Sequence, residues 1–174
     1  MSGVPTNEWF APIVAELRLA AEHALLRRLD AGSGFADPRI ASQIYLRDAA
    51  ANARIAGGTL RPQHTHGAAL AQLGAAIDGA RARIDDTRLG TLIARLGLDA
   101  TAGALVAATL AYAVDLDTRE LAHALAGPRR PPGLYVDTCA DLLELPPAQL
   151  LRAIALGSPL RRSRALAIDG DSLD

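Results

Sequence analysis

The stretch 100-ATAGALVAATLAYAV-114 decides the fold of this chain. Its fifteen residues carry no charge, and Asp99 and Asp115 bound it on either side. A helix of this length spans about 22 Å, which is shorter than the roughly 30 Å hydrocarbon core of a bilayer. A helix that is apolar all round and too short to cross a membrane is typical of the centre of a globular domain. The sequence therefore predicts a buried central helix over residues 100–114, with Asp99 as its N-terminal cap.

The composition favours a mainly α protein around this helix. The chain has 174 residues, of which 50% are hydrophobic, 21% charged and only 3% aromatic. The core must therefore consist of Leu, Ile, Val and many Ala residues, and Ala is the best helix former. This length allows one ordinary domain or two small ones.

Charge and cysteine content exclude several classes of protein. All 18 basic residues are Arg, which is typical of a GC-rich genome, and the formal net charge of −1 gives no overall field that attracts nucleic acid or an anionic membrane. The single cysteine, Cys139, excludes an intrachain disulfide and a cysteine-based zinc site. Because the sequence has no signal peptide, transit peptide or membrane span, we expect a cytoplasmic location.

Apolar residues at spacings of three and four predict further helices. These helices cover residues 8–29, 37–56, 67–84, 89–96, 118–126, 134–145 and 148–156. Asp117 and Glu120 form a D-x-x-E pattern, which predicts a capping box at the start of the helix over 118–126. Residues 160–168 mix Arg with Leu, Ala and Ile and predict a strand, and residues 169–174 predict a polar tail.

Four motifs in the second half of the chain resemble those of a known family. Residues 92–99, LIARLGLD, are similar to its L-x-x-R-x-x-L-S leader, and residues 114–117, VDLD, to the E-L-D motif that closes its apolar helix. Residues 129–132, RRPP, are similar to its arginine-proline connector, and residues 159–168 to its closing P-L-x-x-x-x-L-x-L strand. The family is the N-terminal winged-helix-type domain of some bacterial AAA+ ATPases, of the kind associated with contractile phage-tail-like injection systems.

This resemblance implies an architecture and a function. The expected fold is mainly α, with a multi-helix N-terminal region over residues 1–85 and a winged-helix-like domain with a short β wing over residues 86–174. The expected function is that of a non-catalytic N-terminal domain, which docks a protein partner or substrate of an AAA+ machine. The chain has no lysine and therefore no G-x-x-x-x-G-K-[ST] phosphate-binding loop. We therefore expect ATPase activity, and any oligomer formed through it, only on a downstream module absent from this chain.

Five arginines are the candidate partner-binding residues. Arg129 and Arg130 precede the helix predicted over 134–145, and Arg161, Arg162 and Arg164 lie on the predicted wing. Arginine pairs with carboxylates through two parallel hydrogen bonds, so this set suits an acidic protein partner. The alternative is that these residues are ordinary solvated charges on a strand surface.

The second hypothesis is a winged-helix nucleic-acid-binding protein that uses the wing arginines. By its position, the helix around residues 135–145 would be the recognition helix, and it carries Asp137, Asp141 and Glu144 on one face. These carboxylates have the wrong sign for phosphates, and no side chain beside them reads a base edge. The interaction with protein is therefore preferred, and nucleic acid is not expected as the partner.

No residues of the sequence combine into a catalytic, cofactor or metal site. His64 and His66 supply two possible metal ligands, but a site needs a third and a fourth. Cys139 is predicted to be a buried structural thiol and not a nucleophile, because the nearby Asp137 and Asp141 raise a thiol pKa instead of lowering it. His23 and His123 are predicted to be half-buried polar residues. We expect no enzyme activity and no cofactor, and a helical enzyme with a histidine-lined cavity is the third hypothesis.

Overall fold

The computed structural model describes residues 10–32, 49, 52–53, 66–84, 87–126, 130–131, 133–164, 168–169 and 172–173. Within these ranges the chain forms eight helices and three short strands, which confirms a mainly helical protein. They are α1 (Ala11–Asp30), α4 (Gly67–Arg81), α5 (Arg88–Arg95), α6 (Ala100–Val114), α7 (Leu116–Ala126), β1 (Leu134–Tyr135), α8 (Val136–Leu143), α9 (Pro147–Ala153), α10 (Pro159–Ser163), β2 (Ile168–Asp169) and β3 (Ser172–Leu173). The helix predicted over 37–56 lies outside the described residues, except for positions 49, 52 and 53.

The central helix α6 has the predicted bounds. The Asp99 carboxylate accepts a hydrogen bond from the backbone N–H of Ala102 at 2.8 Å and so satisfies one of the free donors at the helix start. Gly97, at a φ of 62°, turns the chain from α5 into α6 in the left-handed conformation that glycine adopts most easily. Among the described residues no single helix is long and apolar enough to cross a membrane. Helices α6 and α7 have the required length and apolar composition only when they are taken together, and they meet at a bend of 112°.

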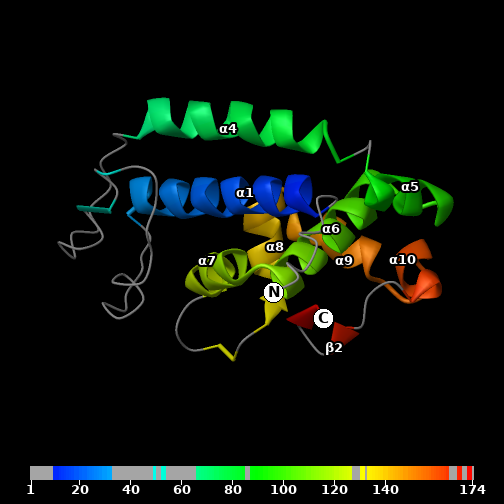
Figure 1. Ribbon diagram of the computed structural model, residues 1–174. Helices are drawn as coiled ribbons and strands as arrows, with labels where there is room; N and C mark the ends of the chain where they lie inside the picture. Colours follow the sequence, from blue (N-terminus) through cyan, green and yellow to red (C-terminus); the bar gives the residue numbers. More distant parts are fainter. Residues whose placement is uncertain are drawn as a thin grey trace, which may run out of the picture.

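Helix α1 lies between two layers of the molecule (Figure 1). On one side it packs against α6, α7 and α8, and on the other side it packs against α4. Leu17 and Leu25 of α1 share one core with Leu105 of α6 and Leu142 of α8. Residues on both sides of the predicted domain boundary at 85–86 therefore contribute to this core, and the boundary itself stays a prediction.

Helix α4 contacts the rest of the molecule mainly through α1. Glu16 of α1 is buried beneath it and accepts a hydrogen bond from Arg81 Nε at 3.0 Å. A small apolar cluster joins the same two helices. It consists of Leu19, Ala20, Ile77 and Ala80. The opposite face of α4 is exposed, so this helix forms an outer layer of its own.

The three strands form a small antiparallel sheet in the order β1-β3-β2. In this sheet Leu134 lies opposite Leu173, and Leu173 lies opposite Ile168. The helix predicted over 134–145 is therefore wrong at its start, and the tail predicted over 169–174 contains part of a hairpin. Two-residue strands are too short to show alternation, so periodicity cannot detect them.

Two further local predictions are wrong for physical reasons. The segment predicted as a strand over 160–168 begins with the helix α10, because the Ser158 hydroxyl caps it and Pro159 suits the first helical turn. The capping box predicted at Asp117 is replaced by a cap at Asp115. The Asp115 carboxylate accepts hydrogen bonds from the backbone N–H of Thr118 at 2.8 Å and from its hydroxyl at 2.6 Å.

Gly103 allows α5 and α6 to approach closely, and its replacement by Ala tests this contact. A Cβ atom at position 103 would lie 2.9 Å from Cγ2 of Ile93, which is too near the Ile93 backbone to move away freely. We expect Gly103→Ala to destabilise the protein by about 1 kcal/mol in urea unfolding, because the steric cost exceeds the gain in helix propensity. The matched control is Gly74→Ala in α4, where nothing lies within 4 Å. That variant should gain up to about 1 kcal/mol, and a gain at position 103 as well would contradict the close packing.

Candidate partner-binding surface

Two of the five predicted partner-binding arginines, Arg129 and Arg130, precede α8, and the structure describes only the second of them. Arg129 lies outside the described residues. Arg130 is engaged within the chain: its Nη1 lies 2.7 Å from Asp137, and its guanidinium lies 4.8 Å from the centroid of the Tyr135 ring. Tyr135 in turn donates a hydrogen bond to the carbonyl of Pro131 at 2.8 Å. Arg130 therefore holds the connector against the start of α8.

The other two carboxylates of this segment bind α1. Arg28 pairs with Asp141, and His23 Nδ1 lies 2.7 Å from Glu144. Arg27 donates a hydrogen bond to the backbone carbonyl of Asp141 at 2.8 Å. The face of α8 that the nucleic-acid hypothesis would turn toward phosphates is therefore engaged with α1 through its Asp141 and Glu144 side chains.

The three arginines predicted on the wing lie in and just after α10. Arg161 is half-buried, and its Nε donates a hydrogen bond to the carbonyl of Ile154 at 3.1 Å, which fixes α10 to the end of α9. Arg162 and Arg164 are exposed, and their guanidinium groups have no partner among the described residues. These two side chains are available to a ligand.

The sequence did not predict that α9 adds exposed residues to the candidate partner-binding surface. Arg152 on this helix is exposed and has no partner within the described part of the chain. Leu151 beside it is 54% exposed, and Leu156, in the turn that leads to α10, is 90% exposed. A signal was present, because residues 145–164 contain four arginines and no carboxylate. The exposed leucines were not detectable, because α9 is too short for an apolar period to separate its two faces.

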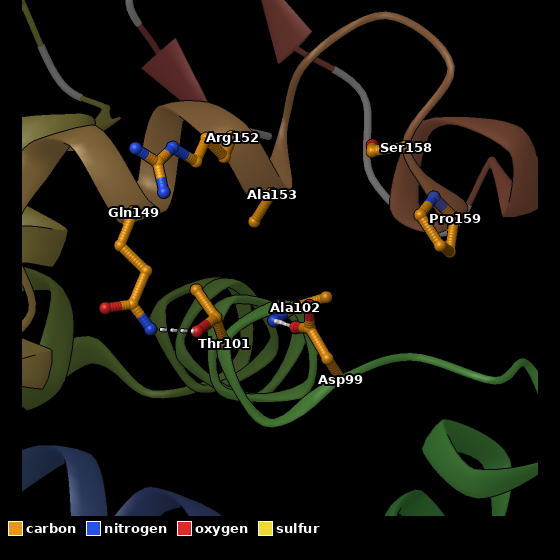
Figure 2. A pocket seen from close by; sticks show the side chains of 8 residues that line it. All are labelled: Asp99, Thr101, Ala102, Gln149, Arg152, Ala153, Ser158 and Pro159. Carbon is orange, nitrogen blue, oxygen red and sulfur yellow. Dashed lines mark hydrogen bonds between the residues drawn. The ribbon is translucent and has the colours of Figure 1, made fainter.

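A pocket of about 210 Å³ lies between the start of α6, α9 and the start of α10 (Figure 2). Its lining consists of Asp99, Thr101, Ala102, Gln149, Arg152, Ala153, Ser158 and Pro159. Gln149 Nε2 donates to the Thr101 hydroxyl at 2.6 Å, while Asp99 and Ser158 both cap helices. This volume is below the roughly 300 Å³ at which sites for small molecules begin. The polar groups of the pocket hold the helices together, and Arg152 is the member left without a partner among the described residues.

Cys139 is fully buried, as predicted. Burial, together with the charge of Asp137, raises the pKa of its thiol to about 12. A thiol of this kind stays protonated at neutral pH and is a poor nucleophile. In the described parts of the chain, no three His, Cys, Asp or Glu side chains lie close enough together to hold a metal ion.

The three histidines within the described residues lie at buried or half-buried positions. His23 and His123 are half-buried, as predicted, and His123 Nε2 forms a hydrogen bond with the Tyr112 hydroxyl at 2.7 Å. Burial and the nearby charge of Arg119 lower the pKa of His123 below its ordinary value, so its ring is neutral at pH 7. His66 is buried at the start of α4, and its backbone N–H donates to Asp30 at 3.2 Å. His64 lies outside the described residues.

No protein-family model, no curated protein and no solved structure matches this chain. Membership of the AAA+ N-terminal family therefore stays a prediction. The candidate partner-binding surface is the exposed side of α9 and α10.

Proposed function

We propose that this chain is a non-catalytic interaction domain, the N-terminal region of a bacterial AAA+ ATPase, and that it docks a protein substrate or assembly partner. The observation that carries the proposal is the set of exposed arginines on α9 and α10, which have no partner in the described part of the chain and lie beside exposed leucines. The ATPase module would lie outside these 174 residues, since the chain has no lysine for a phosphate-binding loop. The domain would act in the cytoplasm.

The order of elements supports a winged-helix-like interpretation of residues 116–173. Helix α7 is followed by β1, by the helices α8 and α9 and, after α10, by the strands β2 and β3, which pair with β1. A three-residue turn joins α8 to α9, and it begins with Glu144 in the left-handed region at a φ of 53°. In a helix-turn-helix the second helix contacts the ligand. The helix that contacts the ligand would then be α9. The sequence alone would give that role to the helix around residues 135–145.

A nucleic acid is the second candidate for the ligand. It is favoured by the four arginines of residues 145–164, which no carboxylate of that stretch neutralises. Against it, Gln149 is bonded to Thr101, so Arg152 is the one free side chain on α9 that suits a base edge. The exposed Leu151 and Leu156 also have no counterpart in a phosphate backbone. A protein partner accounts for both the arginines and the leucines.

Site-specific photo-crosslinking in the native host tests this proposal. A photoreactive amino acid at Leu156 should form a discrete adduct that protease removes and nuclease does not. The same group at Gln72, which is exposed on α4, is the matched control and should form no such adduct. Arg152→Glu with Arg162→Glu should reduce the adduct at position 156 about tenfold, because charge reversal at exposed positions weakens docking without unfolding the domain. An adduct that only nuclease removes would select the nucleic-acid candidate, and absence of any adduct would refute the proposal.

A further inference from the structure

Exposed apolar side chains gather at one end of the molecule. Among the described residues six large apolar side chains are exposed, and four of these are leucines at the end where α6 begins. Leu92 is 48% and Leu96 is 37% exposed on α5, while Leu151 is 54% and Leu156 is 90% exposed on α9 and the turn after it. Helices α5 and α10 lie at the same end of the molecule (Figure 1), and the start of α6 lies between them (Figure 2).

Helix α5 has one apolar stripe, and this stripe is only partly buried. Its apolar residues follow the spacing i, i+3, i+4 and i+7 and therefore share one side of the helix, and they are Leu89, Leu92, Ile93 and Leu96. Leu89 is buried in the core and Ile93 packs against Gly103 of α6, whereas Leu92 and Leu96 stay exposed. The exposed part of this stripe suits contact with another molecule.

The helices at this end also carry exposed arginines. Arg88 and Arg95 on α5 and Arg152 and Arg162 on α9 and α10 are exposed, and their guanidinium groups have no partner among the described residues. The carboxylate of Asp99 at this end is already bonded as the cap of α6. We call this surface the leucine–arginine end; it comprises the four exposed leucines and these four arginines.

We infer that the leucine–arginine end binds an acidic amphipathic segment of a partner protein. Leucine-like side chains of the partner would cover the leucines of α5 and α9, and its carboxylates would pair with the exposed arginines at this end. This inference rests on the proposed docking function and adds the chemistry of the partner.

Two other occupants fit less well. A nucleic acid would pair with the arginines but would leave four exposed leucines without apolar contacts. A second copy of this chain would offer Val114 and Leu116, which are 50% and 62% exposed at the other end of α6. There, however, Asp117 is paired with Arg18, so Glu120 is the one nearby carboxylate without a partner in the described residues. One free carboxylate does not balance four arginines.

The test uses the full chain and two synthetic peptides of about 18 residues, or about five helical turns. The first peptide carries a leucine stripe flanked by glutamates, and the second has the same composition in scrambled order. We expect the first to bind with a micromolar Kd and to shift the NMR signals of α5, α9 and α10. Either pair, Leu92→Ser with Leu156→Ser or Arg95→Ala with Arg152→Ala, should weaken binding about tenfold. The control Leu116→Ser should leave it unchanged.

Each alternative outcome overturns the inference. Equal binding of the scrambled peptide would show attraction by charge alone. Tighter binding of a DNA duplex at about 0.15 M salt would assign the surface to nucleic acid. Self-association in sedimentation that Leu92→Ser with Leu156→Ser abolishes would assign it to a second copy. If position 156 crosslinks to a protein but the amphipathic peptide does not bind, the docking function stands and only the acidic partner chemistry fails.

Discussion

Replacing Leu105 with Asp is expected to abolish cooperative folding of the chain. Leu105 is completely buried in the middle of α6, within the core that α6 shares with α1, α7 and α8. An unpaired carboxylate there costs several kcal/mol, and the apolar contacts of the leucine are lost as well. We expect the free energy of unfolding to fall by about 4 kcal/mol or more. The whole free energy of unfolding of a typical domain is only about 5–15 kcal/mol.

Circular dichroism and urea unfolding measure this effect. The matched control is Leu116→Asp at the start of α7, where the side chain is 62% exposed, and it should change the unfolding midpoint little. A soluble Leu105→Asp variant with the wild-type midpoint would show that α6 is not the centre of the core.

Asp115→Ala is expected to destabilise the protein by about 2 kcal/mol. The Asp115 carboxylate accepts two hydrogen bonds from Arg18, both at 2.8 Å, and two more from Thr118, so it joins α1 to the corner between α6 and α7. The loss is not larger because the Arg18 side chain is 37% exposed, so water replaces part of the lost interaction. Urea unfolding at pH 7 measures the change.

The matched control for this variant is Asp117→Ala. Asp117 also pairs with Arg18, but its side chain is 65% exposed and it caps no helix. We expect a loss below about 0.5 kcal/mol for that change. Equal losses for the two variants would show that the cap and the partly buried pair contribute nothing beyond a surface charge.

The same carboxylate makes stability depend on pH in a defined direction. Burial opposes the ionisation of Asp115, but its hydrogen bonds with Arg18 and Thr118 outweigh that cost and hold its pKa below the ordinary 3.8. The folded state therefore favours the ionised form. Its stabilising contribution is complete above about pH 4 and is lost as the pH falls through the lower, folded-state pKa. The stability difference between wild type and Asp115→Asn should accordingly shrink when unfolding is measured at decreasing pH below 4.

Local sequence signals predicted the longer helices well. The run over residues 100–114 and its bounding aspartates identified α6 to the residue, and three- and four-residue spacings located α1, α4 and α5 within a few positions of their ends. Such patterns depend on neighbours within one helix. Strands β1 and β3 were missed because Leu134 and Leu173 pair across a distance in sequence that no local period records.

The candidate surface was predictable only in part. Arg162 and Arg164 were identified from their cluster, whereas Arg130 belongs to a contact with Tyr135 that only the folded chain reveals. Arg152 was missed because its neighbours in sequence are apolar. The exposure of Leu156 was missed because the sequence shows which residues are apolar but not which of them the fold leaves uncovered.

The position of α1 has a consequence during synthesis of the protein. Its side-chain contacts with Asp115 and with Asp141 join residues 97 and 113 positions apart, so α1 leaves the ribosome long before these partners exist. At about 5–20 residues per second, its apolar face waits roughly 5–20 s for α6 and α7. Helix α4 follows much sooner and covers only the opposite side of α1. We expect the nascent chain to depend on chaperones during this interval, and to acquire its final core only when α8 has emerged.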